Sequence, residues 1–199
     1  MAKRKAKIAI IMGKSSTGKD TIYKLLIQRT NLKEIIPYTS RPPRSNETEG
    51  KDYFFVSEEY FKENKDKVIE SRTYDTIYGP WTYGELNDGQ INDESEYDYL
   101  LVTTLEGYEG FLKYFDKESV VPIYIEVDDG VRLQRALDRE RAQEKPKYTE
   151  MCRRYLADTE DFSEDKLLVL NIKNRVENDE IEDTIAKILK KLDEENFRY

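Results

Sequence analysis

One short segment near the N-terminus constrains the fold more than any other part of this 199-residue chain. Ile8 to Met12 is an unbroken apolar run, as expected of a parallel strand whose sheet is covered on both faces. Farther on, Ile22, Leu25 and Leu26 stand at helical spacing within residues 21–28. Between the two lies Gly13-Lys14-Ser15-Ser16-Thr17-Gly18-Lys19-Asp20-Thr21. The segment therefore predicts a buried strand, a glycine-flanked loop and a helix in direct succession.

The glycine and lysine spacing of this loop is that of a phosphate-binding loop. Gly13 and Gly18 let backbone N–H groups curl around an anion, and the helix beginning near Asp20 directs its positive end to the same place. Lys19 adds a cation for the β- and γ-phosphates, so we expect residues 13–21 to bind ATP. An ordinary serine-rich turn between a strand and a helix is the alternative.

Asp20 occupies the position at which such loops usually carry the hydroxyl residue that binds Mg²⁺. A carboxylate is a hard, charged oxygen ligand and can hold Mg²⁺ directly or through water. Thr21 offers a hydroxyl, but one residue farther on it is turned by about 100° around the helix. We expect Asp20 to be a magnesium ligand or to hold the ligands in place. The alternative is a charge that only stabilises the helix N-terminus.

Beyond the loop, strands alternate with helices, which predicts an α/β fold with a parallel sheet flanked by helices. The further expected strands of this sheet are Tyr97 to Thr103, Val120 to Val127 and Lys166 to Ile172. The further expected helices are Val131 to Arg141, Glu150 to Phe162 and a final one, which Asn178 caps. Residues 38–90 break this rhythm with prolines, glycines and the short aromatic strands Tyr53 to Val56 and Val68 to Tyr74, and so predict a small inserted subdomain.

Composition excludes several classes of function. The chain has no histidine, so no mechanism can use imidazole as base, nucleophile or metal ligand. Cys152 is the one cysteine, which excludes an internal disulfide and suits a reducing cytoplasm. The formal net charge of −8 disfavours nucleic-acid binding. No apolar run approaches the roughly 18 residues of a membrane span, so we expect a cytoplasmic protein with neither a membrane nor a nucleic-acid partner.

A second candidate anion site follows in the predicted insertion. Arg41 and Arg44 lie three residues apart in Thr39-Ser40-Arg41-Pro42-Pro43-Arg44, and two arginines held by prolines can form a fork around a dianion. Farther on, Glu70 adds a carboxylate that can accept hydrogen bonds from the N–H edge of a purine, and Tyr78 adds a phenol. For each of these charged residues a solvated surface pair is the alternative.

Together these motifs resemble the guanylate kinase family over nearly the whole chain. The resemblance rests on segments in the family's order: Gly13…Gly18-Lys19, Thr39-Ser40-Arg41…Arg44, Gly50-Lys51-Asp52-Tyr53, Ile69-Glu70, Tyr78-Gly79, Arg135…Arg139, Arg153-Arg154 and Val169-Leu170-Asn171. It implies one guanylate-kinase-like domain with an ATP-binding core (about residues 1–37 and 95–199), an inserted monophosphate-binding mixed α/β subdomain (about 38–92) and a helical lid (about 136–152).

The resemblance also implies a reaction, the ATP- and Mg²⁺-dependent phosphorylation of GMP or dGMP. By resemblance the acceptor's phosphate is gripped by four residues, Arg41, Arg44, Tyr53 and Tyr78. Glu70 would meet the acceptor's base, and Asn171 would join the loop in binding ATP. The sequence carries no signal for an oligomeric state.

The base-reading positions depart from the family's pattern. Pro37 stands where the family usually has a serine, and Pro80 where it has a small hydroxyl residue. Where the family has an acidic residue at the end of a strand, this chain has Val102-Thr103-Thr104. Thr103 and Thr104 can therefore offer hydrogen bonds to a substrate but no charge. The phosphate-gripping residues are kept. Phosphoryl transfer is therefore better supported than a preference for guanine.

Arginines gather in the predicted lid. Arg135 and Arg139 share one face of a helix at i, i+4, and Arg153 and Arg154 lie on the next helix. Paired singly with nearby acids they would be ordinary surface residues. Together they suit direct phosphoryl transfer, in which catalysis is mostly positioning and neutralisation of charge and no protein nucleophile is needed.

Two other functions stay open. Guanylate-kinase-like domains also occur as non-enzymatic binding modules of scaffold proteins, and the altered base contacts and Asp20 favour that reading, whereas the intact Lys19 opposes it. The chain could also be a kinase for another nucleotide or small phosphorylated acceptor, because Pro37 leaves the base contact undefined.

Overall fold

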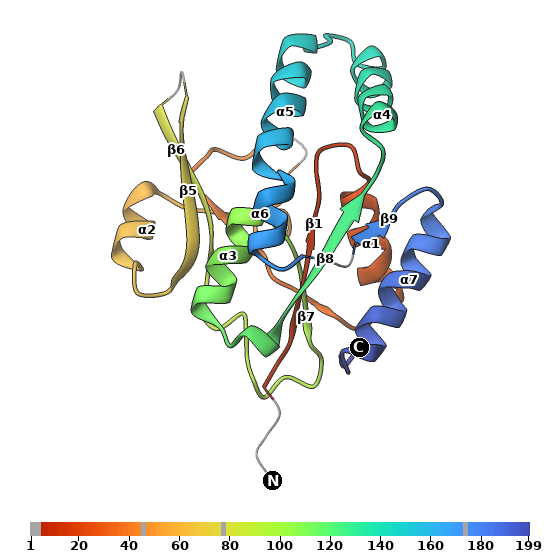
Figure 1. Ribbon diagram of the computed structural model, residues 1–199. Helices are drawn as coiled ribbons and strands as arrows, with labels where there is room; N and C mark the ends of the chain where they lie inside the picture. The colour runs from red at the N-terminus through yellow and green to blue at the C-terminus, as the bar shows by residue number, and fades with distance from the viewer. Residues whose placement is uncertain (1–4, 45–46, 77–78, 173–174) are drawn as a thin grey trace.

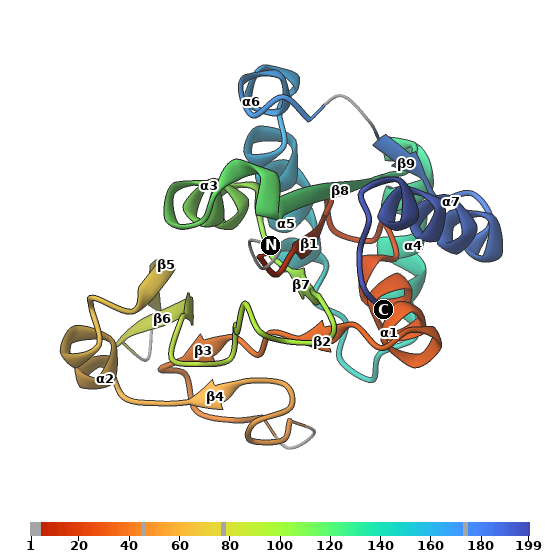
Figure 2. The same cartoon turned by 90° about the horizontal axis from the view of Figure 1, so that it is seen from below.

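The computed structural model describes residues 5–44, 47–76, 79–172 and 175–199. In these residues the chain forms two sheets and seven α-helices (Figures 1 and 2). All strands of the larger sheet are parallel to their neighbours, which confirms the expected α/β class. In spatial order these strands are β2 (Lys33–Glu34), β7 (Tyr99–Val102), β1 (Ile8–Met12), β8 (Val120–Glu126) and β9 (Arg175–Glu177).

The central strand β1 is buried along its whole length. Side chains alternate between the faces of a strand, so Ile8, Ile10 and Met12 join one hydrophobic core and Ala9 and Ile11 join another. The first core includes residues of α3 (Leu105–Tyr114) and α6 (Glu164–Val169), and the second includes residues of α1 (Lys19–Arg29) and α7 (Ile181–Glu194). Figure 2 shows these helices on opposite faces of the sheet. The unbroken apolar run follows from this double coverage.

The smaller sheet has four strands and lies beside the larger one (Figure 2). In spatial order they are β4 (Phe54–Phe55), β3 (Tyr38–Thr39), β6 (Gly79–Leu86) and β5 (Val68–Thr76). Helix α2 (Glu58–Glu63) packs on this sheet through a small core of Tyr38, Phe61 and Leu86. The chain therefore enters this sheet after β2 and leaves it before β7. The subdomain boundaries given above stay a prediction.

Two further helices, α4 (Asp129–Arg141) and α5 (Tyr148–Asp161), rise beyond the end of β8 (Figure 1). The side chain of Asp128 caps α4 by accepting a hydrogen bond from the N–H of Val131 at 3.1 Å. Residues 142–147 join the two helices and include Pro146, which cannot continue a helix. Among the described residues, no helix has both the length and the apolar composition needed to span a membrane.

Two sequence-based expectations are wrong. The segment Lys166 to Ile172 is not a strand but the end of α6 and the turn after it, with Leu167 buried and Val169 exposed. A short apolar run has no period that separates a strand from a buried helix. The last strand of the sheet is β9 instead. Asn178 does not cap α7 either, because the N-cap residue is Glu180.

Candidate active site

The loop between β1 and α1 has the backbone expected of an anion-binding cradle. Gly13, Ser16 and Gly18 have positive φ angles of 156°, 64° and 87°. A Cβ atom on Gly13 would lie 2.6 Å from the carbonyl oxygen of Ile125, and one on Gly18 would lie 2.7 Å from Nδ2 of Asn178. Both positions therefore require glycine. The Ser16 hydroxyl is buried and has no hydrogen-bond partner among the described residues, which leaves it available to an anion.

Lys19 begins α1 and lines the cavity beside the loop. Its Nζ donates a weak hydrogen bond of 3.5 Å to the carbonyl oxygen of Lys14. Burial lowers the pKa of Lys19, and the carboxylates of Asp20 and Asp158 oppose this shift. A partly desolvated ammonium group with few protein partners fits a phosphate chain.

Asn178, which follows β9, holds the loop from behind. Its Nδ2 donates to the carbonyl oxygen of Thr17 at 2.7 Å, and its Oδ1 accepts from the Thr184 hydroxyl at 3.0 Å. Asn171, the asparagine expected at the ATP site, lies in the exposed turn after α6 and lines no cavity next to the loop. The asparagine that touches the loop is therefore Asn178.

Arg132 and Asp158 clamp the other side of the loop, and sequence reasoning gave neither residue this role. The guanidinium of Arg132 is fully buried, donates to the carbonyl oxygen of Ser15 at 3.0 Å and lies over the ring of Tyr155. The carboxylate of Asp158 accepts from the N–H of Ser15 at 2.8 Å. Helices α4 and α5 therefore both contact the loop through these side chains. The Asp158 carboxylate also accepts a hydrogen bond from a loop N–H that could otherwise bind an anion.

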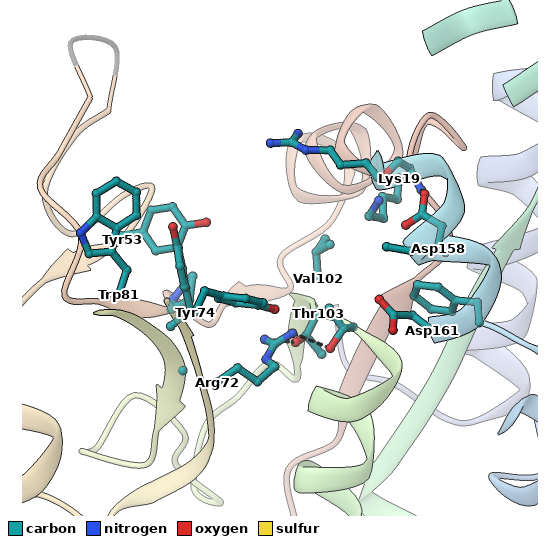
Figure 3. A pocket seen from close by; sticks show the side chains of 18 of the residues that line it. Lys19, Tyr53, Arg72, Tyr74, Trp81, Val102, Thr103, Asp158 and Asp161 are labelled. Carbon is teal, nitrogen blue, oxygen red and sulfur yellow. Dashed lines mark hydrogen bonds between the residues drawn. The ribbon is translucent and has the colours of Figure 1, made fainter. Parts of the chain in front are cut away.

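A cavity of about 900 Å³ separates the loop from the smaller sheet. Figure 3 shows its two walls: Lys19, Asp158 and Asp161 on one side, and the rings of Tyr53, Tyr74 and Trp81 on the other. Its other lining residues include Arg44, Arg72, Val102, Thr103 and Thr104. The candidate donor and acceptor residues therefore face one shared space.

The two arginines of the acceptor loop have different environments. The Arg44 side chain is 65% exposed, lines the cavity and lies 4.0 Å from Glu47. The Arg41 side chain is only 4% exposed and does not line the cavity. Two of its nitrogens donate to the Glu47 carboxylate at 2.8 and 2.9 Å. Its Nε donates to the Tyr83 hydroxyl at 3.1 Å. In this conformation the two arginines form no open fork, because Glu47 holds Arg41.

Glu70 also differs from its expected placement. It is buried, and its Oε1 accepts a hydrogen bond of 2.7 Å from Arg72. Arg72 lines the cavity, whereas Glu70 does not. Thr103 and Thr104 line the cavity as expected, and Thr104 also caps α3 by accepting from the N–H of Gly107 at 3.1 Å. Tyr53 lines the wall, and burial raises its pKa. Tyr78 lies outside the described residues.

Three of the four candidate lid arginines line cavities next to the loop. Arg153 and Arg154 line the large cavity, and each donates to Glu150 at 2.8 Å, which lowers the pKa of Glu150 to about 2. Arg139 lines a neighbouring cavity of about 370 Å³ together with Arg154. Arg44, Ser15 and Ser16 line it too. Arg135 is exposed and lines neither cavity.

Asp20 is exposed at the start of α1 and lines neither cavity. Over the described residues, no three Asp, Glu, His or Cys side chains form a group that could hold a metal ion. Mg²⁺ needs no such group, since it commonly takes one carboxylate and completes its shell with water and substrate phosphates. The residues present fit a metal that arrives with the nucleotide.

Comparison with known proteins identifies the family. A sequence model described as guanylate kinase matches residues 5–195. The guanylate kinase of Mycoplasma mobile is 39% identical over 120 residues, 58% of each chain, and that of Caldanaerobacter subterraneus is 43% identical over 81 residues, 39% of each chain. The alignments thus span less than two thirds of these curated relatives.

A solved structure gives the same answer for the fold. The crystal structure of guanylate kinase from Anaplasma phagocytophilum superposes with a TM-score of 0.61 at 23% identity, and the match covers 96% of this chain and 87% of that one. Because the family match extends over almost the entire chain, the protein belongs to the guanylate kinase family.

Proposed function

We propose that this protein transfers the γ-phosphoryl group of ATP to a nucleoside monophosphate, with GMP or dGMP as the preferred acceptor. The observation that carries the proposal is the shared cavity, in which Lys19 lies on one wall and Arg44 and Tyr53 line the acceptor side. The curated relatives named guanylate kinase support GMP as the acceptor.

Different residues bind the donor, the acceptor and the transition state. The loop N–H groups, the Ser16 hydroxyl and Lys19 hold the donor's phosphates. Arg44, Tyr53 and Tyr78 hold the acceptor's phosphate. Arg41 also binds this phosphate once the incoming dianion displaces Glu47, whose carboxylate accepts two hydrogen bonds from the Arg41 guanidinium in this structure. The reaction is an in-line transfer between two bound phosphates, so no side chain acts as a nucleophile.

The lid arginines neutralise the charge that spreads over the transferring group. Arg139, Arg153 and Arg154 line the cavities beside the loop, and Arg135 joins them when the lid helices α4 and α5 close. Closure also excludes water, which would otherwise hydrolyse ATP. Asp20 would hold Mg²⁺ directly or through water, and the metal would supply positive charge that offsets part of the charge of the phosphates.

A coupled ADP-release assay with GMP, dGMP, AMP, CMP, UMP and dTMP tests this proposal. We expect turnover with GMP or dGMP and its loss in Lys19→Ala. Undiminished turnover of Lys19→Ala would refute the scheme.

A non-catalytic binding module is the second candidate, because the apolar Val102 lines the cavity where the family resemblance implies an acidic residue. Binding of Mg-ATP without turnover of any monophosphate would favour that candidate over the kinase.

A further inference from the structure

We infer that Glu58 is a positioning residue for the acceptor's phosphate. Through Ser40 it fixes the start of the acceptor loop, residues 39–44, from which Arg41 and Arg44 project. Glu58 lines neither of the cavities beside the phosphate-binding loop, so it acts through the protein and not on the nucleotide. The inference rests on the proposed function, because this loop serves the acceptor side of that reaction.

The pairing of β3 with β6 changes where the acceptor loop begins. Thr39 lies opposite Tyr83 in the antiparallel pair. One residue farther on, the N–H of Ser40 still donates to the carbonyl oxygen of Thr82 at 2.9 Å. The N–H of Thr82 donates to two side-chain oxygens, Oγ of Ser40 at 2.7 Å and Oε1 of Glu58 at 3.1 Å. Side chains therefore complete the hydrogen bonding at the point where the chain leaves the sheet.

The carboxylate of Glu58 is the centre of this hydrogen-bond network. Its Oε1 accepts from the Ser40 hydroxyl as well as from the Thr82 N–H, and its Oε2 accepts from the Thr82 hydroxyl at 2.8 Å. The Thr82 hydroxyl also lies 2.8 Å from that of Thr73 across the β5–β6 pair. Glu58 therefore connects α2 to β6 and to the acceptor loop at the same time.

This network lies directly behind the group that holds Arg41. Side chains alternate between the faces of a strand, and Trp81 and Tyr83 both line the cavity, so Thr82 between them faces α2 instead. Figure 1 shows α2 and the lid helix α5 on opposite sides of the β5–β6 hairpin. The Tyr83 hydroxyl accepts from Nε of Arg41 at 3.1 Å. A shift of Thr82 therefore also shifts the tyrosine that orients the Arg41 guanidinium.

The main chain of the loop depends on the same anchor. The Thr39 hydroxyl donates to the carbonyl oxygen of Thr82 at 3.0 Å and accepts from the N–H of Arg41 at 3.2 Å. Together with the Ser40 contacts, these bonds hold three consecutive loop residues to one residue of β6, which Glu58 holds from α2. A loop that is ordered before its ligand arrives loses less conformational entropy on binding. Glu58 therefore favours acceptor binding by keeping the loop ordered.

The charge of Glu58 has the opposite effect. Glu58 contacts the residue that precedes Arg41, so its negative charge repels a dianion bound by Arg41. If charge alone mattered, any neutral replacement would strengthen acceptor binding. If positioning dominates, a replacement that cannot accept hydrogen bonds weakens binding, whereas one that can accept them does not. The sign of the change therefore distinguishes the two effects.

Three variants in steady-state kinetics with GMP and ATP test the inference. Glu58→Ala should raise KM for GMP about tenfold, as for loss of a hydrogen bond to a charged group, with KM for ATP within about twofold of the wild type. Glu58→Gln keeps a carbonyl oxygen for Ser40 and Thr82 and should stay within about threefold for both nucleotides. Glu59→Ala is the matched control, because it removes the same charge from the next residue of α2, whose carboxylate is exposed and pairs with Lys62 at 3.9 Å. It should leave both KM values unchanged.

Several outcomes would overturn the role of Glu58. A fall or no change in KM for GMP in Glu58→Ala would show that the anchor does not dominate. An equal rise in KM for ATP, or a Glu58→Gln variant as weak as Glu58→Ala, would also overturn it.

Ser40→Ala tests the route through the loop. It should raise KM for GMP as well, and the double variant with Glu58→Ala should be hardly worse than Glu58→Ala alone, because both remove one contact. Losses that add in full would overturn this route. If Glu58→Ala does not fold, Ser40→Ala decides alone, since an unchanged KM for GMP there overturns the inference.

The inference and the proposed function fail in different ways. If no monophosphate is phosphorylated, the proposed function fails, and calorimetric binding of GMP to the wild type and to Glu58→Ala still decides the inference. Weaker binding by the variant supports it, and equal or tighter binding overturns it. A wild type that binds no GMP overturns both.

Discussion

Replacing Asn178 by alanine should loosen the phosphate-binding loop. The side chain is buried and donates 2.7 Å to the carbonyl oxygen of Thr17, itself a buried residue. The Thr184 hydroxyl, which donates to Asn178, would still donate a hydrogen bond of 2.9 Å to the carbonyl oxygen of Glu180. One buried acceptor is therefore orphaned, which costs about 1–3 kcal/mol. For a chain of this size that lowers Tm by roughly 2–12 °C.

The effect should extend to ATP, because the loop that binds its phosphates is no longer held. We expect a higher KM for ATP and a nearly unchanged KM for the monophosphate, measured together with thermal unfolding. Asn171→Gly is the matched control, since Asn171 has a positive φ of 56° that glycine adopts without strain. If Asn171→Gly weakened ATP binding and Asn178→Ala did not, the assignment of Asn178 to the loop would be refuted.

Three further substitutions probe the cavity. Arg44→Ala removes an exposed guanidinium on the acceptor side and should raise KM for the monophosphate by roughly 10- to 100-fold, with little change in KM for ATP. Equal weakening of both nucleotides would mean that Arg44 does not bind the acceptor specifically. Asp158→Asn removes the negative charge next to the Ser15 N–H and should tighten ATP binding roughly fivefold in calorimetry, whereas weaker binding would mean that Asp158 assists the nucleotide. The raised pKa of Glu85 means that its folded form holds a proton more tightly than the unfolded chain, so stability falls as pH rises above about 4.5 toward that raised value. Glu85→Gln should flatten this fall in the pH dependence of unfolding, and an unchanged profile would contradict it.

The sequence predicted most of what is local in the fold. The apolar run of β1, the loop glycines and α1 are encoded by contiguous residues, so their order and type followed directly. The segment Lys166 to Ile172 failed because a short apolar run is compatible with either a strand or a buried helix. Only the packing of Leu167 on the first core distinguishes the two.

The site was harder to predict because its contacts join distant segments. Glu47 lies close to Arg41 in sequence, yet nothing in the pattern shows that the two are paired in a buried site. Asn178 and Thr17 are far apart along the chain, so their hydrogen bond had no local signal. Arg72 did have one: a strand over Val68 to Tyr74 places residues 70, 72 and 74 on one face, which would have marked it as a neighbour of Glu70.

The account depends on donor and acceptor sites that open into one space. Isothermal titration with a bisubstrate analogue, in which a phosphate chain joins adenosine to guanosine, measures this directly. We predict that the analogue binds once per chain, more tightly than either nucleotide, and that it competes with both ATP and GMP. An analogue that displaces only one of the two nucleotides, while the other still binds, would contradict the shared cavity.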